Sequence, residues 1–306
     1  MSIFNTASIP CPVCNTPKKF NLVASVNADR RPDLRAAIMD GSFQREKCDS
    51  CSNTFRTAPL MTYLDMARHQ WILVQPAADV ARWQLLAEKA KSVFSVAYGP
   101  EAVPEAQEIG RDMKPRVVFG WSALSEKILA AELGLDDVNL ELVKLAVLRE
   151  VPDPPLNDVN ELRLTGIEGD ELVLTWINPE DETFAGSLKV PREVYDDIAA
   201  DTGDWQPLRE ELSADPFVDF QKLMTDEAAA EAEGGEETTA AEESEGGDEG
   251  GEEEGDEEGE EEEEKGGKRS GGKKAKSKPK AKAKKAPAKK RSVPKKAVPK
   301  KKGKKK

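Results

Sequence analysis

Four cysteines within the first 51 residues are the side chains of this sequence best suited to chemistry. They form two Cys-x-x-Cys pairs, Cys11 with Cys14 and Cys48 with Cys51, and the chain contains no other cysteine. Thiolates two residues apart can bind one metal ion, because a single backbone turn presents both sulfurs while its amides stabilise their charge. Two such pairs supply four tetrahedral ligands. The sequence therefore predicts that Cys11, Cys14, Cys48 and Cys51 bind one structural zinc ion.

Two other interpretations of the cysteines remain open. A redox-active pair is one, although a thioredoxin-like protein has a single such motif that opens a helix after a strand. Unpaired buried thiols are the other, and they would leave the paired spacing as a coincidence. The interval 15–47 is longer than the roughly 15 to 20 residues of a compact zinc ribbon, so we expect an insertion between the two pairs. Asn15 and Ser52 stand where glycine is usual.

Motifs for catalysis are scarce in the rest of the chain. His69 is the only histidine, so a Ser-His-Asp triad would have to use it, and we expect a structural or surface role for it instead. The sequence has no phosphate-binding loop, dinucleotide fingerprint or calcium loop. Arg30, Arg31 and Arg35 stand at the start of an expected helix and would bind an anion only if they converged there. A solvated helix start is the simpler interpretation. An enzyme is therefore not the leading expectation, although the question stays open.

The elements that would position the cysteines are short strands around one short helix. Pro32 suits a first helical position, and Gly41 suits the residue that ends that helix. Further along, Ser122 and Asp137 are expected to cap two helices, the second of which is apolar nearly all round and should be buried. Trp71, Trp83, Trp121 and Trp176 are expected in the core. The expected strands are 19–26, 42–47, 53–57, 70–74, 116–120, 162–167, 171–177 and 187–190, and the expected helices are 32–39, 77–98, 104–109, 122–133, 137–148, 191–200, 207–212 and 218–224.

The first part of the sequence resembles the CpXC-domain proteins of bacteria and archaea, over about residues 8–130. Besides Cys11-Pro12-Val13-Cys14, the resemblance rests on three segments, which are Ser25-Val26-Asn27-Ala28, Pro32-Asp33-Leu34 and Tyr63-Leu64-Asp65. The second motif departs from the family pattern, because Asp49 stands where proline is expected. The resemblance implies a zinc site at the four cysteines. It implies no reaction, because the family has no assigned activity.

The last 80 residues divide into two blocks of opposite charge. Residues 227–264 hold 21 acidic residues and no base, whereas residues 265–306 hold 22 basic residues and no acid. The acidic block lacks aromatic residues and cannot bury enough apolar surface to fold, so we expect disorder there. The basic block repeats lysine pairs with alanine and proline and resembles the tails of linker histones and histone-like bacterial proteins. Such a tail binds DNA or RNA phosphates without reading bases.

Together these features predict an α+β protein in four parts. They are a zinc-ribbon-like β subdomain with an appended helix (1–120), a small α+β domain of unknown role (121–226), and disordered acidic (227–264) and basic (265–306) blocks. The expected function is a zinc-stabilised, non-enzymatic interaction module with a polyanion-binding tail that the acidic block partly masks, and an unknown protein partner. The alternatives are an enzyme with a site between the two domains and a protein-binding module with solubilising tails. Because we find no signal peptide or membrane span, we expect a cytoplasmic protein that associates with the nucleoid.

Overall fold

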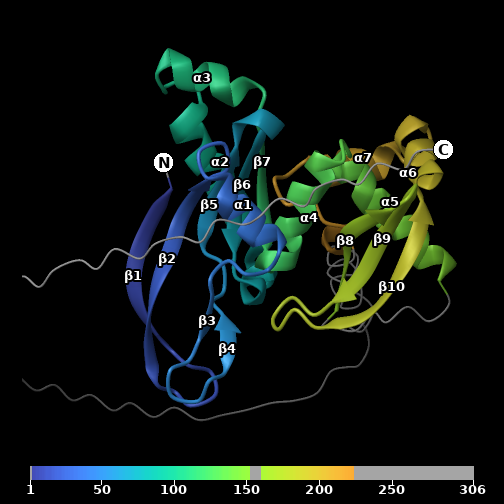
Figure 1. Cartoon of the computed structure of the whole chain (residues 1–306). Helices are drawn as coiled ribbons and strands as arrows, with labels where there is room; N and C mark the ends of the chain where they lie inside the picture. Colours follow the sequence, from blue (N-terminus) through green and yellow to red (C-terminus); the bar gives the residue numbers. More distant parts are fainter. Residues whose placement is uncertain (1, 152–159, 224–306) are drawn as a thin grey trace, which may run out of the picture. The chain divides into compact units, whose positions relative to one another are not determined.

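A mixed five-stranded sheet forms the first part of the computed structural model, which describes residues 2–151 and 160–223 (Figure 1). Its strand order is β1-β2-β5-β6-β7. β1 and β2 pair antiparallel, as do β5 and β6, whereas the β2–β5 and β6–β7 pairs are parallel. The strands are β1 (Ile3–Pro10), β2 (Pro17–Asn27), β5 (Met61–Asp65), β6 (Gln70–Gln75) and β7 (Lys114–Phe119).

Two helical layers cover the two faces of this sheet. The alternation along β6 places Ile72 and Val74 on one face and Trp71 and Leu73 on the other. The first face packs against α1 (Pro32–Met39) and α4 (Gly120–Glu132), and the second against α2 (Trp83–Tyr98). The central strand is therefore buried on both sides. The connections η1 (Met66–Arg68), η2 (Ala77–Arg82) and α3 (Pro104–Arg111) complete this part of the chain.

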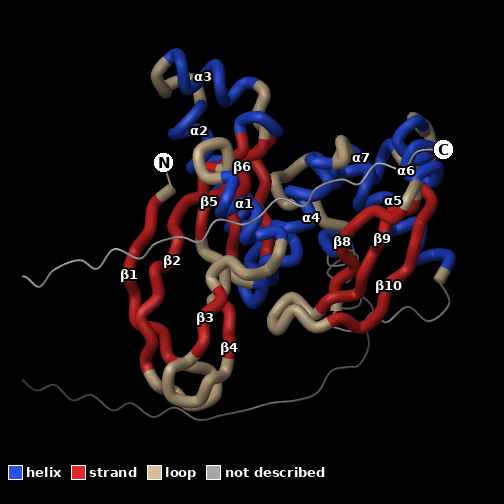
Figure 2. The backbone as a smooth tube through the Cα atoms, in the orientation of Figure 1, coloured by secondary structure: helices blue, strands red, loops and turns tan. Residues whose placement is uncertain are grey.

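A separate antiparallel sheet follows, in the order β10-β9-β8. One face packs on α5, α6 and α7 through leucines of the helices and strands and through Trp176. The helix α4 contacts β6, β7 and β8, so it joins the two sheets (Figure 2). All described residues belong to one compact unit. The elements are α5 (Asp137–Glu150), β8 (Glu161–Glu168), β9 (Glu171–Ile177), β10 (Phe184–Pro191), α6 (Arg192–Ala200) and α7 (Gln206–Ser213).

The fold is thus a mixture of helices and sheets, as expected, but several details of the sequence prediction were wrong. The helix α5 is capped by Asp136, whose carboxylate accepts from the amides of Val138 and Asn139, and not by Asp137. Ser122 lies inside α4, because that helix begins two residues earlier, at Gly120. The segment 77–82 forms a 3-10 helix before α2 begins at Trp83.

Two strands were absent from the sequence prediction. In β5 the buried residues Met61, Tyr63 and Asp65 alternate with less buried ones. Because Asp65 is a carboxylate, the strand lacks the fully apolar alternation by which a sequence predicts a strand. The strand β1 is mostly exposed, so its apolar alternation is weak. The expected acidic and basic blocks, 227–264 and 265–306, lie outside the described residues.

Candidate metal centre

The first cysteine pair lies in the turn between β1 and β2. The amide of Cys11 donates to the carbonyl of Thr16 at 3.0 Å, and the amide of Asn15 donates to the carbonyl of Cys11 at 2.9 Å. Asn15 has a φ of 57°, a left-handed conformation that asparagine tolerates better than most residues. These contacts fold residues 11–16 into a tight knuckle in which both cysteine side chains point to one place.

The second pair repeats this arrangement between β3 (Arg45–Lys47) and β4 (Thr54–Arg56). The amide of Cys48 donates to the carbonyl of Asn53 at 2.7 Å, and the amide of Ser52 donates to the carbonyl of Cys48 at 3.0 Å. Ser52 has a φ of 61°, so it takes the left-handed position that Asn15 takes in the first knuckle. Both residues therefore do occupy the conformation for which glycine is usual. The departure from proline at Asp49 has not prevented the knuckle from forming.

The fold brings the two knuckles together and groups all four sulfurs. The Sγ atoms of Cys11 and Cys51 are 3.6 Å apart, as are those of Cys14 and Cys48, and all four ligand atoms lie within 4.8 Å of one another. Tetrahedral zinc with Zn–S bonds of about 2.3 Å requires sulfurs about 3.8 Å apart, whereas a disulfide requires about 2.05 Å. The four thiols are free. Their spacing fits a metal ion and not a disulfide.

The electrostatic repulsion that four neighbouring thiolates would experience is a second argument for a bound cation. Hydrogen bonds with Thr16 lower the pKa of Cys14 to about 6. At Cys51 the amide of Asn53 acts in the same direction, but burial and the neighbouring thiols outweigh it and raise the pKa to about 12. Four thiolates this close repel one another, so full ionisation requires a compensating positive charge. A divalent metal ion supplies that charge.

Contacts around the sulfurs hold the knuckles against each other. The ring of Phe20 on β2 lies 5.3 Å from that of Phe55 on β4, centroid to centroid. The ammonium group of Lys18 pairs with Asp49 at 3.3 Å and with Glu46 at 3.7 Å, which links the first hairpin to the second. One cysteine of each knuckle is buried, Cys11 and Cys48, while Cys14 and Cys51 are exposed. The cluster thus lies at the surface with one buried side.

Comparison with known proteins agrees with this geometry. Residues 9–144 match the family model described as CpXC protein. The matched region contains both knuckles, the other four strands of the five-stranded sheet with only the last two residues of β1, and the chain as far as Lys144 in α5. No curated protein and no solved structure matched the chain. The CpXC match and the cysteine cluster together indicate a metal-binding module.

The arginines expected at the start of α1 do not converge on an anion site. Arg31 pairs with Asp33 at 2.7 Å, and Arg35 pairs with Glu132 on α4 at 2.6 Å. The charges of Arg31 and Arg35 are thus paired within the protein, and with Arg35 only 17% exposed the helix start is not simply solvated as the simpler interpretation expected. The four tryptophans expected in the core are all buried. His69 is exposed, with a φ of 55°, and ends the 3-10 helix η1.

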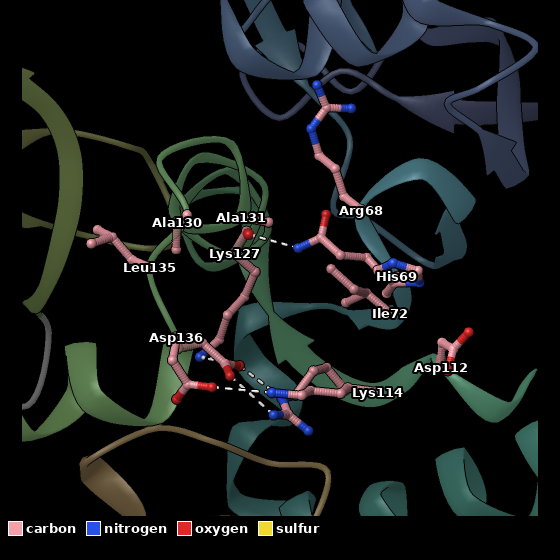
Figure 3. Close-up of a pocket in the computed structure, with 14 residues that line it drawn as sticks. Arg68, His69, Ile72, Asp112, Lys114, Lys127, Ala130, Ala131, Leu135 and Asp136 are labelled. Atoms are coloured by element: carbon pink, nitrogen blue, oxygen red, sulfur yellow. Dashed lines mark hydrogen bonds and ion pairs between the residues drawn. The ribbon is translucent and has the colours of Figure 1, made fainter. Parts of the chain in front are cut away.

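His69 also lines a cavity of about 380 Å³ between β6, β7, α4 and the start of α5, shown in Figure 3. Four of the charged side chains that line this cavity form two ion pairs. Lys114 pairs with Asp136 at 3.1 Å, and Arg116 pairs with Asp137 at 2.7 Å. The side-chain amide of Gln70 donates to the carbonyl of Lys127 on α4. These pairs lock the walls together and leave His69 without a nearby arrangement typical of a nucleophile and its base.

Sequence analysis missed a network of buried charges beside this cavity, where α5 was expected to be apolar nearly all round. The Lys144 ammonium lies 2.8 Å from Glu126 and 3.0 Å from Glu141, and all three side chains are fully buried. Arg163 on β8 pairs with Glu126 at 3.1 Å and with Asp219 at 2.7 Å. These carboxylates lie where a site between two domains was considered, but their partners hold them as structural ions. The sequence signal that could have found this network was the presence of charged residues, such as Glu126, Glu141 and Lys144, within otherwise apolar segments.

Membrane-spanning structure was a separate question. Within residues 2–151 and 160–223, none of the helices has the combination of length and apolar character that crossing a bilayer requires.

Proposed function

We propose that this protein is a zinc-stabilised interaction module whose lysine-rich C-terminal block binds polyanions. The observation that supports the first half is the group of four free thiols within 4.8 Å, built by two knuckles with the same hydrogen bonds. Four thiolates fill a tetrahedral coordination sphere, so such a zinc keeps no position for water or substrate. The role proposed for the metal is therefore structural, and it requires a reducing compartment.

The metal would act by joining the two hairpins, in addition to the Phe20–Phe55 and Lys18 contacts between them. The strand β3 is exposed at all three of its residues, and β4 is at most half-buried. A hairpin with so little buried surface is marginal by itself. Bonds from one ion to Cys11 and Cys14 on one side and to Cys48 and Cys51 on the other would fix its position. Metal binding would then be coupled to the folding of this region.

The second half of the proposal rests on charge. Residues 265–306 hold 22 lysines and arginines, and such a block binds phosphate backbones by releasing their counterions. The adjacent 21 acidic residues of 227–264 are tethered beside it and would compete with external phosphates for the lysines. At about 0.1 M salt the Debye length is roughly 10 Å, so this competition between neighbouring charges would persist in the cell.

Fluorescence anisotropy with a labelled duplex across a salt series tests the proposal. The full chain should bind weakly and without base preference, deletion of 227–264 should tighten binding, and deletion of 265–306 should abolish it. Affinity should fall steeply as salt rises. Equal affinity with and without the acidic block would contradict masking. Binding that does not depend on salt would contradict the polyanion function itself. The same conclusion would follow if neither the full chain nor the form without the acidic block bound the duplex.

A further inference from the structure

A cavity of about 360 Å³ separates the end of α1 and one face of α4 from the β9–β10 hairpin. It is distinct from the cysteine cluster and from the cavity beside His69. Phe184 is 73% exposed and marks its open side. The cavity has mainly apolar walls, which is the usual character of a small-molecule site, and the apolar residues that line it are Ile38, Met39, Leu129, Leu164, Ile177 and Phe184.

Arg56 provides a buried cation at this cavity. Its guanidinium lies 4.1 Å from the ring centroid of Trp121, and its Nε donates to the carbonyl of Phe43 at 2.8 Å. Only 6% of the side chain is exposed, yet Nη2 has no hydrogen-bond partner among the described residues. A buried guanidinium donor without an acceptor is costly, so it is a strong candidate to bind a ligand.

A second residue that lines the same cavity also carries an unpartnered polar atom. Ser122 lines the cavity from the first turn of α4, and its buried Oγ likewise lacks a partner in the part of the chain that the structure describes. The first amides of a helix carry partial positive charge, and the N-cap residue Phe119 contributes no side-chain hydrogen bond to them. Arg56, Ser122 and the start of α4 therefore all favour a negatively charged group.

The protein already places one carboxylate here. Glu182, in the turn between β9 and β10, extends its two oxygens to Arg45 and Arg56, one to each guanidinium. Its backbone is left-handed, with a φ of 60°. Despite this partner, burial lowers the pKa of Arg56 below its ordinary value, because one carboxylate shared between two arginines does not fully compensate the desolvated charge. Charge is thus available for a second carboxylate.

We propose that this cavity binds a small amphiphilic carboxylic acid, with its carboxylate on Arg56 Nη2 and Ser122 Oγ and its hydrocarbon part along α4 and the hairpin. Glu182 acts as an intramolecular competitor that weakens binding. A monoanion with a hydrocarbon chain fits better than phosphate, because Asp40 and Glu182 also line the cavity and oppose a dianion, and because phosphate has no apolar part to cover the apolar walls. The acid would enter from the side of Phe184.

Isothermal titration calorimetry on the full chain, with hexanoate as the probe, tests this site. Hexanoate should bind, whereas hexanamide, which has the same chain without the charge, and inorganic phosphate should not. Glu182→Gln removes the competing charge and should tighten hexanoate binding about tenfold. Glu180→Gln makes the same change at an exposed position of the same turn and should leave binding unaltered.

Arg56→Gln should abolish hexanoate binding, and circular dichroism establishes whether this variant is folded. If Arg56→Gln does not fold, the contrast between tighter binding in Glu182→Gln and unaltered binding in Glu180→Gln decides the question. The proposal is overturned if hexanoate binds neither the native chain nor the Glu182→Gln variant. Equal binding of hexanoate and hexanamide would overturn it as well, because the cavity would then be only apolar.

Discussion

Ser52 holds a left-handed backbone conformation directly after Cys51, with a φ of 61°. For a residue with a β-carbon this conformation costs roughly 1–2 kcal/mol, and asparagine reduces that cost by local hydrogen bonding. The two knuckles therefore differ in strain, although their hydrogen bonds correspond. The second knuckle, with Ser52 in place of Asn15, is the less favourable of the two.

Ser52→Gly should stabilise the metal-bound protein by about 0.5–1 kcal/mol, because glycine adopts this conformation without strain but loses more backbone entropy on folding. The gain for Asn15→Gly should be smaller, near zero. Urea unfolding of the zinc-loaded protein measures both. Ser50→Gly is the matched control, since Ser50 has no positive φ, and it should give no gain. A larger gain at Asn15 than at Ser52 would contradict this account of the knuckles.

Sequence reasoning worked well for the residues of the cysteine cluster. Cysteine type and spacing predict a four-sulfur cluster directly, and the position after each pair predicts the left-handed residues Asn15 and Ser52. It worked less well where partners come from distant parts of the chain. Nothing local to Arg56 predicts that Trp121 lies under its guanidinium or that Glu182, 126 residues away, extends to it.

Among the elements, the junction of β7, α4 and α5 depends on Asp137. Its carboxylate takes two hydrogen bonds from Arg116, at 2.7 and 3.0 Å, and lies 3.2 Å from the Lys127 ammonium. Burial alone would raise the pKa of Asp137, but Lys127 and Arg116 outweigh burial and hold the pKa well below its usual value of 3.8. This carboxylate therefore stabilises the fold fully above about pH 4, and that stabilisation is lost as the pH falls further.

Asp137→Asn should destabilise the protein by roughly 3 kcal/mol at pH 7, because it removes the carboxylate paired with Arg116 and leaves the buried Lys127 ammonium with Glu141 as its paired carboxylate, at 3.4 Å. The free energy of unfolding should also fall less between pH 5 and pH 3, since the titrating group is gone. Urea titrations at several pH values measure both effects. Asp136→Asn is the control at the neighbouring position, where asparagine caps a helix as well as aspartate does. An equal pH dependence in Asp137→Asn and the native chain would contradict the role of this residue.

The same junction shows why some elements were difficult to predict. The preference of aspartate for the N-cap position allows either Asp136 or Asp137 to cap α5. Partners on β7 and α4, which are distant in the sequence, decide which of the two aspartates faces the helix amides. Similarly, the buried ions Glu141 and Lys144 belong to a network of charges that comes from four parts of the chain. The local sequence shows only charged residues within an apolar helix and does not show their partners. Periodicity predicted α5, β8 and β9 well because their apolar residues far outnumber these exceptions.

Considering the whole molecule, the last described segment returns to the first sheet. The carbonyl of Pro216 accepts from the amide of Val117 on β7 at 3.0 Å, and the carbonyl of Val218 accepts from Lys127 on α4 at 2.8 Å. Asp219 pairs with Arg163 on β8. These contacts anchor the segment to both sheets. After residue 226 the composition changes to charged residues with glycine and alanine, and this composition is the basis for the predicted boundary.

Limited digestion with a non-specific protease should therefore leave a fragment that ends near Met224. The anchored segment before it should resist cleavage, and the charged blocks after it should be removed first. Mass spectrometry of the resistant fragment gives its end. A fragment that extends beyond about residue 240, or early cleavage between 214 and 223, would contradict this boundary.

The claim that four cysteines hold one structural zinc ion is tested most directly by native mass spectrometry of protein purified without oxygen. The account predicts one zinc per chain in the native protein. Cys48→Ala should hold none, because three thiolates bind the ion less tightly and leave a coordination position open. Ser50→Ala, inside the same knuckle, should retain the metal. Metal-free native protein, or protein with a disulfide between Cys11 and Cys14, would contradict the account and favour a redox pair.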